Sequence, residues 1–255
     1  MIRCYATFEG RNTYYAIFPW ADGGTLADLW MDPDCIERTP GRDVWTLQQM
    51  LGLAKALAAL HRRNCRHGDL KPQNILYFKT TAEPRLVIGD VGVSRIHKFG
   101  TLVRVEQTNT MATTPSYEAP EVSGGSVEKR SRRYDIWSLG CIFLEYVTWL
   151  LFGYGRIKEF RNERKATDCY GYFYKLLDNG VIGIHPKASE AIDQLLRHPQ
   201  CGPGTPFRAL VTLISERLLK VNVEERAEAS ELVTNLQEIV TKFEAQERTT
   251  PEGMQ

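Results

Sequence analysis

Apolar residues recur every three or four positions along several long stretches of the chain, and this spacing predicts helices. The stretches cover residues 44–63, 136–152, 207–221 and 227–243. In the first of them Asp43 is the expected N-cap. It precedes an apolar stripe made of Leu47, Met50, Leu51, Ala54, Leu57 and Ala58. From Tyr134 onward the pattern is helical. Most of the chain is therefore predicted to form helices.

Shorter apolar runs near turn residues predict a few strands. Arg3–Phe8 and Tyr14–Trp20 flank a Gly-Arg-Asn turn, and Ile75–Phe78 and Leu86–Ile88 flank a turn at Glu83 and Pro84. A short helix over Thr25–Trp30 follows the first pair. The polar segment 246–255 is expected to be a disordered tail. The fold class predicted from these patterns is α+β, mainly α.

The composition is that of an ordinary globular protein and excludes several classes of function. The chain is 43% hydrophobic and 25% charged, with a formal net charge of +1. So balanced a charge gives no overall field that would draw the chain to nucleic acid or to an anionic membrane, so we expect neither partner. Any partner must therefore be recognised locally.

The cysteines and the apolar segments give expectations about location. The six cysteines show no spacing typical of a zinc site, which favours a reduced, cytoplasmic or nuclear setting. The first residues do not have the pattern of a signal peptide. The most apolar stretch, 138–153, is interrupted by Glu145 and is too short for a clean membrane span, so it is predicted to be a buried helix.

The segment His-Gly-Asp-Leu-Lys-Pro-Gln-Asn-Ile-Leu, residues 67–76, carries the strongest chemical signal. It resembles the catalytic loop of serine/threonine protein kinases. Phosphoryl transfer needs an oriented hydroxyl and neutralised charge more than covalent help. The resemblance implies that Asp69 accepts the hydroxyl proton, Lys71 stabilises the moving phosphoryl group and Asn74 binds Mg²⁺. His67 is expected to be structural.

A second segment, Ile-Gly-Asp-Val-Gly at residues 88–92, follows at the spacing of the family's metal-binding motif. The resemblance makes Asp90 the second Mg²⁺ ligand. Val91 stands where the family usually has phenylalanine, which puts the usual in/out switching of this motif in doubt. By itself, Asp-Val-Gly would be an ordinary turn.

Downstream segments resemble further parts of the same family. Residues 113–121 resemble the activation segment that receives the peptide, with Thr114 near the catalytic residues and Tyr117 following it; without the resemblance they would be a capped helix start. Asp135 is expected to hydrogen-bond the backbone of the catalytic loop. Glu121 and Arg226 are expected to form a largely buried ion pair. These last three residues are predicted to be structural.

The segment 16–26 resembles the strand and connector against which adenine lies. The resemblance makes Phe18 the gatekeeper. The carbonyl of Pro19 and the amide of Ala21 would meet the adenine edge, and Leu76 would form part of the floor. ATP and Mg²⁺ are thus the implied cofactors, and a protein is the implied substrate.

The sequence departs from the family before this connector, because it has no glycine-rich loop, no lysine on a third strand and no glutamate on a regulatory helix. The expected organisation is a remnant of the small lobe at 1–22, a kinase-like large lobe at 23–245 and the tail at 246–255. The resulting expectation is a truncated, weakly active kinase, in which a partner or a missing segment completes the small lobe. The alternative is a noncatalytic, pseudokinase-like binding or scaffold module.

Three segments resemble a subgroup of the family more than the family as a whole. Phe-Pro-Trp-Ala-Asp at 18–22, His-Gly-Asp at 67–69 and Glu-Tyr-Val-Thr-Trp-Leu-Leu at 145–151 resemble a group of filamentous-fungal serine/threonine kinases.

Overall fold

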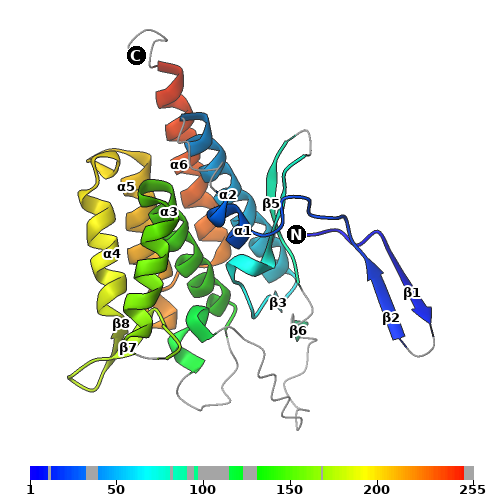
Figure 1. Ribbon diagram of the computed structural model, residues 1–255, viewed down its shortest axis with the longest axis horizontal. Coiled ribbons are helices and arrows are strands. Elements are labelled where there is room, and N and C mark those ends of the chain that lie inside the picture. Colours follow the sequence, from blue (N-terminus) through cyan, green and yellow to red (C-terminus); the bar gives the residue numbers. More distant parts are fainter. Residues whose placement is uncertain are drawn as a thin grey trace.

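The structure is a computed structural model that describes residues 1–10, 13–32, 40–80, 83–90, 95–96, 115–122, 131–167 and 169–249. Helices make up its body (Figure 1). Their bounds are Leu26–Met31 for α1, Pro40–Arg62 for α2, Arg133–Lys165 for α3, Pro186–Arg197 for α4, Pro206–Leu213 for α5 and Ala229–Thr249 for α6. The predicted α+β, mainly α class is confirmed.

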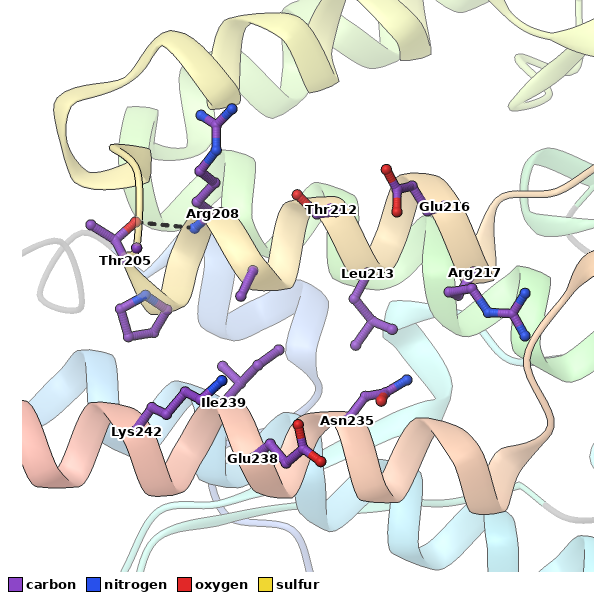
Figure 2. A pocket seen from close by; sticks show the side chains of 13 residues that line it. Thr205, Arg208, Thr212, Leu213, Glu216, Arg217, Asn235, Glu238, Ile239 and Lys242 are labelled. Atoms are coloured by element: carbon purple, nitrogen blue, oxygen red, sulfur yellow. Dashed lines mark hydrogen bonds between the residues drawn. The ribbon is translucent and has the colours of Figure 1, made fainter.

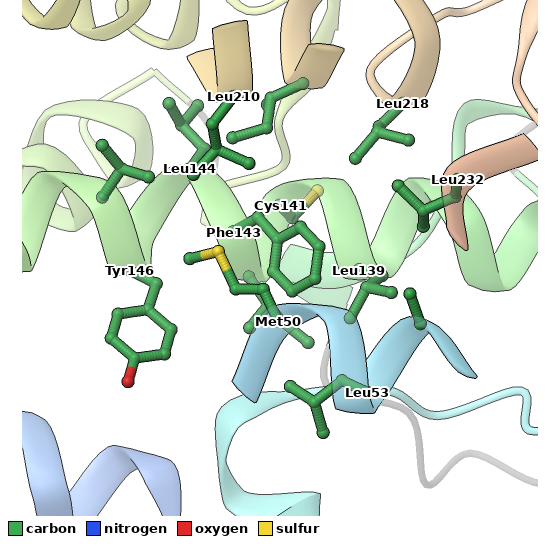
Figure 3. Packing of buried hydrophobic residues seen from close by; sticks show 14 of the residues in the cluster. Met50, Leu53, Leu139, Cys141, Phe143, Leu144, Tyr146, Leu210, Leu218 and Leu232 are labelled. Atoms are coloured by element: carbon green, nitrogen blue, oxygen red, sulfur yellow. The ribbon is translucent and has the colours of Figure 1, made fainter. Parts of the chain in front are cut away.

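The long helix α3 forms the centre of the hydrophobic core. Its first half is buried on all sides, and Figure 3 shows Leu139, Phe143 and Leu144 of this helix among side chains of α2, α5 and α6. By length and composition α3 could cross a membrane, yet 83% of its most apolar window is buried inside the protein. That burial is expected of a core helix and agrees with the sequence prediction.

Several predicted helix ends need correction. α2 begins at Pro40, so Asp43 lies in its first turn and is not the N-cap. The helix predicted over 207–221 ends as α5 at Leu213 and continues as a π-helical turn, η7 (Ile214–Leu218). α6 extends to Thr249, so the first residues of the predicted disordered tail are helical. Residues 250–255 lie outside the described part of the chain.

The prediction for α3 stopped at Phe152, but the helix continues to Lys165 past a kink at Gly153. The backbone of Gly153 has φ 79° and ψ 178°, a conformation that is almost restricted to glycine. A Cβ at this position would meet nothing within 4 Å. The backbone angles, not the space, therefore require a glycine here.

The strands form four separate two-stranded antiparallel sheets. They are β1 (Ala6–Gly10) with β2 (Thr13–Ile17), β3 (Cys65–Arg66) with β6 (Arg95–Ile96), β4 (Ile75–Phe78) with β5 (Arg85–Ile88), and β7 (Tyr174–Leu176) with β8 (Ile182–Ile184). The first and third hairpins were predicted. Short 3₁₀ turns connect several elements: η2 (Pro72–Asn74), η4 (Pro115–Tyr117), η5 (Pro120–Val122), η6 (Pro199–Cys201) and η8 (Val223–Glu225).

The β1–β2 hairpin projects from the helical body (Figure 1). Phe8 stacks on Tyr15 across the hairpin with ring centroids 4.7 Å apart, and both side chains are about half exposed. The backbone N–H of Ile2 donates to the carbonyl of Ile88 at 2.9 Å, which ties the start of the chain to β5. A two-stranded hairpin of this kind has little stability of its own.

Candidate active site

The catalytic-loop segment lies between β3 and β4 and is fixed by a buried carboxylate of α3. Asp135 accepts hydrogen bonds from the backbone N–H groups of His67 and Gly68, each at 2.9 Å, and lies 2.8 Å from Nε2 of His61. Its side chain has no exposed surface. The expected contact between Asp135 and the loop backbone is therefore present, and it sets where the loop leaves β3.

His67 connects this loop to the second motif. Its Nδ1 accepts a hydrogen bond from the backbone N–H of Asp69 at 3.3 Å, so the ring proton resides on Nε2. Nε2 then donates to the carbonyl oxygen of Gly89 at 2.8 Å. Because His67 is fully buried, it holds the residue before Asp90 against the loop.

Asp69, Lys71 and Asn74 converge at one point. The ammonium of Lys71 lies 2.8 Å from Oδ2 of Asp69, and Nδ2 of Asn74 donates to the backbone carbonyl of Asp69 at 2.8 Å and to its Oδ2 at 3.1 Å. Asp69 and Asn74 are each 8% exposed. The amide of Asn74 thus turns its two protons toward Asp69 and leaves its oxygen for another partner.

Asp90 lies beside this cluster. The backbone N–H of Gly89 donates to the carbonyl of Asn74 at 2.9 Å. This bond fixes the backbone of the residue that precedes Asp90. Asp90 has φ 48°, which is uncommon outside glycine, and its side chain is exposed. Val91 and Gly92, which complete the motif, lie outside the described residues.

These residues suit a magnesium ion that completes its shell with other oxygens. Among the described residues, no group of three or more His, Cys, Asp or Glu side chains could hold a metal by itself. Mg²⁺ is usually bound by only one or two carboxylates together with water and substrate phosphates. The carboxylate of Asp90 and the freed amide oxygen of Asn74 are hard donors of the required kind, so the site fits the ion.

The segment predicted to bind adenine is attached to β4. Gly23 N–H donates to the carbonyl of Tyr77 at 3.0 Å, and Tyr77 N–H donates to the carbonyl of Gly24 at 2.8 Å. A Cβ on Gly23 would collide with the Tyr77 ring, so glycine permits this close approach. Asp22 accepts from the N–H groups of Lys79 and Thr80 at 2.9 and 2.8 Å.

The side chains of the predicted adenine site are less enclosed than those of the catalytic loop. Phe18 is 42% exposed, and Pro19 and Ala21 are half-buried. Leu76 is half-buried, and its side chain lies over Gly89, where a Cβ would come within 3 Å of it. Leu76 is therefore next to the predicted metal-binding motif, and the adenine-binding roles stay predictions.

The activation-segment residues are partly described. Thr114 lies outside the described residues. Tyr117 is buried, and its hydroxyl donates to Oε2 of Glu145 at 2.7 Å. The predicted ion pair is present: Nη1 and Nη2 of Arg226 donate to the two carboxylate oxygens of Glu121 at 2.9 and 2.7 Å. Arg226 is fully buried, whereas the Glu121 side chain is 20% exposed.

Sequence reasoning missed the partners of Tyr117. Arg161 and Arg164 come from the second half of α3 and both bind Glu145. The available signal was Glu145 itself, a charge inside the most apolar stretch of the chain. A buried carboxylate needs cations, but the sequence did not show which arginines would supply them.

One hollow lies away from these residues. It has a volume of about 480 Å³ and runs between α5–η7 and α6, with Arg208, Glu216 and Lys242 among its lining residues (Figure 2). None of the lining residues belongs to the catalytic loop or to the segment around Asp90. This hollow is therefore separate from the candidate active site.

Comparison with known proteins gives a consistent result. A family model described as "Protein kinase domain" matches residues 1–237. The chain is 32% identical to a "Death-associated protein kinase related" protein of Drosophila melanogaster, over 77% of the chain and 27% of that protein. It is 31% identical to "Serine/threonine-protein kinase SSK22" of Saccharomyces cerevisiae, over 58% of the chain and 12% of that protein.

A third relative, "Calcium/calmodulin-dependent protein kinase type IV" of Mus musculus, is 28% identical over 78% of the chain and 42% of that protein. The chain therefore spans less than half the length of each of these relatives.

Proposed function

The chain belongs to the protein kinase family, and from this premise we propose that it transfers the γ-phosphoryl group of ATP to serine or threonine hydroxyls of protein substrates. The observation that carries the proposal is the convergence of Asp69, Lys71 and Asn74, with Asp90 held beside them through Gly89. The similarity to serine/threonine kinases over much of the chain supports the same reaction.

Asp69 orients the nucleophile in this proposal. Its carboxylate is nearly buried and already accepts from Lys71 and Asn74, so its position is fixed before a substrate arrives. A hydroxyl that donates to this carboxylate is aligned for attack and can pass its proton to it. Lys71 is close enough to add positive charge where the transferring phosphoryl group develops negative charge.

Magnesium, when bound, neutralises phosphate charge and orients the phosphates. Asn74 and Asp90 are the residues that would hold it, with the amide oxygen of Asn74 set by the hydrogen bonds that its nitrogen donates to Asp69. Phe18, Pro19, Ala21 and Leu76 are proposed to bind the adenine end of ATP. The contacts of Gly23 and Gly24 with β4, and of Asp22 with the two residues after β4, support that placement.

We propose that these 255 residues by themselves transfer phosphate slowly. Their sequence contains no glycine-rich loop and no lysine and glutamate pair ahead of the connector. Removing one preorganised donor from a transition state typically costs about 3 kcal/mol, which is more than a hundredfold in rate. A partner or a further segment that supplied these groups would raise the rate. A cytoplasmic or nuclear setting is proposed from the cysteine pattern.

The noncatalytic alternative draws no support from the described site, because Asp69, Lys71, Asn74 and Asp90 are all retained. Its discriminating feature would be a catalytic loop that lacks one of these side chains. For the whole protein we propose only a class of substrate or partner, namely a protein with an accessible serine or threonine.

Phosphoryl transfer from labelled ATP to a mixed serine/threonine protein substrate, in the presence of Mg²⁺, tests the proposal. We expect slow transfer that falls more than a hundredfold in Asp69→Asn, because that change removes the carboxylate that orients the hydroxyl. Asp193→Asn, an exposed change on α4, is the matched control and should leave the rate unchanged. No transfer by the unmodified chain, equal transfer by Asp69→Asn, or phosphate on tyrosine alone would contradict the proposal.

A further inference from the structure

A buried polar cluster lies behind the turn η4. Glu145 has no exposed surface and receives the Tyr117 hydroxyl at 2.7 Å on Oε2. Arg161 donates to the same carboxylate through Nε at 3.0 Å and Nη2 at 2.7 Å, and Arg164 donates through Nη2 at 3.2 Å. Nη2 of Arg161 also donates to the Tyr117 hydroxyl oxygen at 3.2 Å. Tyr117, Glu145 and Arg161 thus form a closed triangle of hydrogen bonds.

The kink at Gly153 makes this triangle possible. Glu145 and Arg161 are sixteen residues apart, and a straight helix would separate their backbones by about 24 Å. That span is more than the two side chains can bridge. Because the backbone leaves the helical region at Gly153, the second half of α3 returns its arginines to Glu145. The cluster is therefore a consequence of one residue's backbone angles.

The charges of the cluster keep Glu145 ionised. Burial alone would raise the pKa of Glu145, but the guanidiniums of Arg161 and Arg164 and the Tyr117 hydroxyl outweigh it and hold that pKa below its usual value. Burial and the neighbouring Glu145 charge raise the pKa of Tyr117 well above its usual value, so Tyr117 stays a donor. A charged acceptor and a neutral donor give a strong hydrogen bond.

The two arginines have different tasks. Arg164 is almost fully buried, stacks between the rings of Phe160 and Phe173 at 3.9 and 3.8 Å, and donates through Nε to the carbonyl of Gly171 at 3.1 Å. These contacts hold the core together. Arg161 is 25% exposed and is the arginine that contacts Tyr117. Arg161 is therefore the member of the pair that acts on η4.

We propose that Arg161 is a positioning residue for the protein substrate: through Glu145 and Tyr117 it fixes η4, the turn that precedes the Glu121–Arg226 pair. The inference rests on the proposed kinase function for its catalytic consequence. Other bonds complete the attachment of this turn. Ser138 Oγ donates to the carbonyl of Tyr117 at 2.9 Å, and Ser116 Oγ donates to the carbonyl of Tyr170 at 2.6 Å. Loss of Arg161 leaves these bonds in place but removes its hydrogen bond to the Tyr117 hydroxyl oxygen and its two hydrogen bonds to Glu145, the acceptor of that hydroxyl.

The test compares Arg161→Gln, Arg161→Lys and Tyr117→Phe with the unmodified chain. Arg156→Gln is the control, since Arg156 lies on the same half of α3 but pairs with Glu159 and Glu163. We expect Arg161→Gln to raise amide hydrogen exchange over residues 116–122 about tenfold and the KM for a protein substrate about tenfold, as for loss of one charged hydrogen bond. The Kd for Mg-ATP should not change, and Arg161→Lys should restore much of both losses.

The double variant Arg161→Gln with Tyr117→Phe gives the sharper readout. If both residues act through one triangle, the second change should add little to the first. Full additivity, or exchange and KM values for Arg161→Gln equal to those of Arg156→Gln, would overturn the inference. Should Arg161→Gln fail to fold, Arg161→Lys and Tyr117→Phe keep Glu145 paired and decide the question.

The two proposals can fail separately. If the unmodified chain transfers no phosphate, the proposed function fails, and the exchange measurement still decides whether Arg161 fixes η4. If the unmodified chain transfers phosphate and Arg161→Gln changes neither exchange nor KM, only the inference about Arg161 fails.

Discussion

Asp135 and Glu145 lie on the same helix and are both fully buried, yet each fixes a different part of the site. Asp135 accepts from the backbone of His67 and Gly68, so it fixes the start of the catalytic loop. Glu145 accepts from Tyr117, so it fixes the turn η4. A buried carboxylate is costly unless it is fully paired, and both of these are. α3 therefore serves as the frame on which both segments are held.

The charge of Glu145 predicts a dependence of stability on pH. Its folded-state pKa is lowered, so the stability it contributes is present above its unfolded pKa of about 4.3 and is lost as the pH falls through the folded value. Glu145→Gln should lower the free energy of unfolding at pH 7. It should also make that free energy fall less steeply as the pH is lowered. Urea unfolding between pH 7 and pH 3 measures both effects.

Glu190→Gln is the control for that experiment, since Glu190 forms only an exposed pair with Lys187. Its curve should follow that of the unmodified chain, because exposed pairs contribute little. Parallel acid limbs for Glu145→Gln and the unmodified chain would show that Glu145 is not held ionised by the arginines.

At the scale of elements, the local pattern of apolar residues predicted α2, the first half of α3 and α6, because each buries a continuous apolar face. It did not predict the second half of α3, two of whose arginines pair with the buried Glu145 of the first half and whose connection depends on Gly153. The strands β7 and β8 have three residues each, too few for a two-residue period to be recognised. The missed elements are thus those that tertiary contacts define.

Two nearby glycines allow a direct test of the kink. Gly153→Ala should destabilise the protein by about 1–3 kcal/mol, because a side chain is strained at its backbone angles. Gly155→Ala, at which a Cβ also meets nothing within 4 Å and where φ is ordinary, should leave stability unchanged or raise it by up to about 1 kcal/mol.

Thermal or urea unfolding of the two glycine variants gives the comparison. A loss of stability is expected for Gly153→Ala alone, because the space around both positions is open and only the backbone angles differ. Equal effects of the two changes would mean that Gly153 does not require its special conformation.

At the scale of the whole molecule, Arg226 joins parts of the chain that are distant in sequence. It donates to Glu121 of η5, to the carbonyl of Arg133 at the start of α3 at 3.2 Å, and to the carbonyl of Lys220 at 2.6 Å. Its guanidinium also lies 5.1 Å from the Trp137 ring. The motif spacing predicted the Glu121–Arg226 pair, whereas the pairing of Arg161 and Arg164 with Glu145 was not predictable without the fold.

Removal of the carboxylate from this pair should destabilise the whole fold. Glu121→Gln leaves the Arg226 charge buried, at a cost of about 3 kcal/mol. Urea unfolding measures the loss, and Glu238→Gln on the exposed face of α6 is the matched control, expected to change stability by no more than about 0.5 kcal/mol. A loss for Glu121→Gln no larger than for the control would show that carbonyl oxygens alone satisfy Arg226.

We propose that Asn74 and Asp90 form a nucleotide-dependent magnesium site next to Asp69, and calorimetric titration with Mg-ATP tests this proposal most directly. We expect the unmodified chain to bind Mg-ATP, and Asp90→Ala to weaken that binding at least tenfold because it removes the only carboxylate proposed as a ligand. Asp178→Ala, an exposed change in the loop between β7 and β8, should bind as the unmodified chain does. Binding of equal strength in Asp90→Ala, or no binding by the unmodified chain at millimolar nucleotide, would contradict the claim.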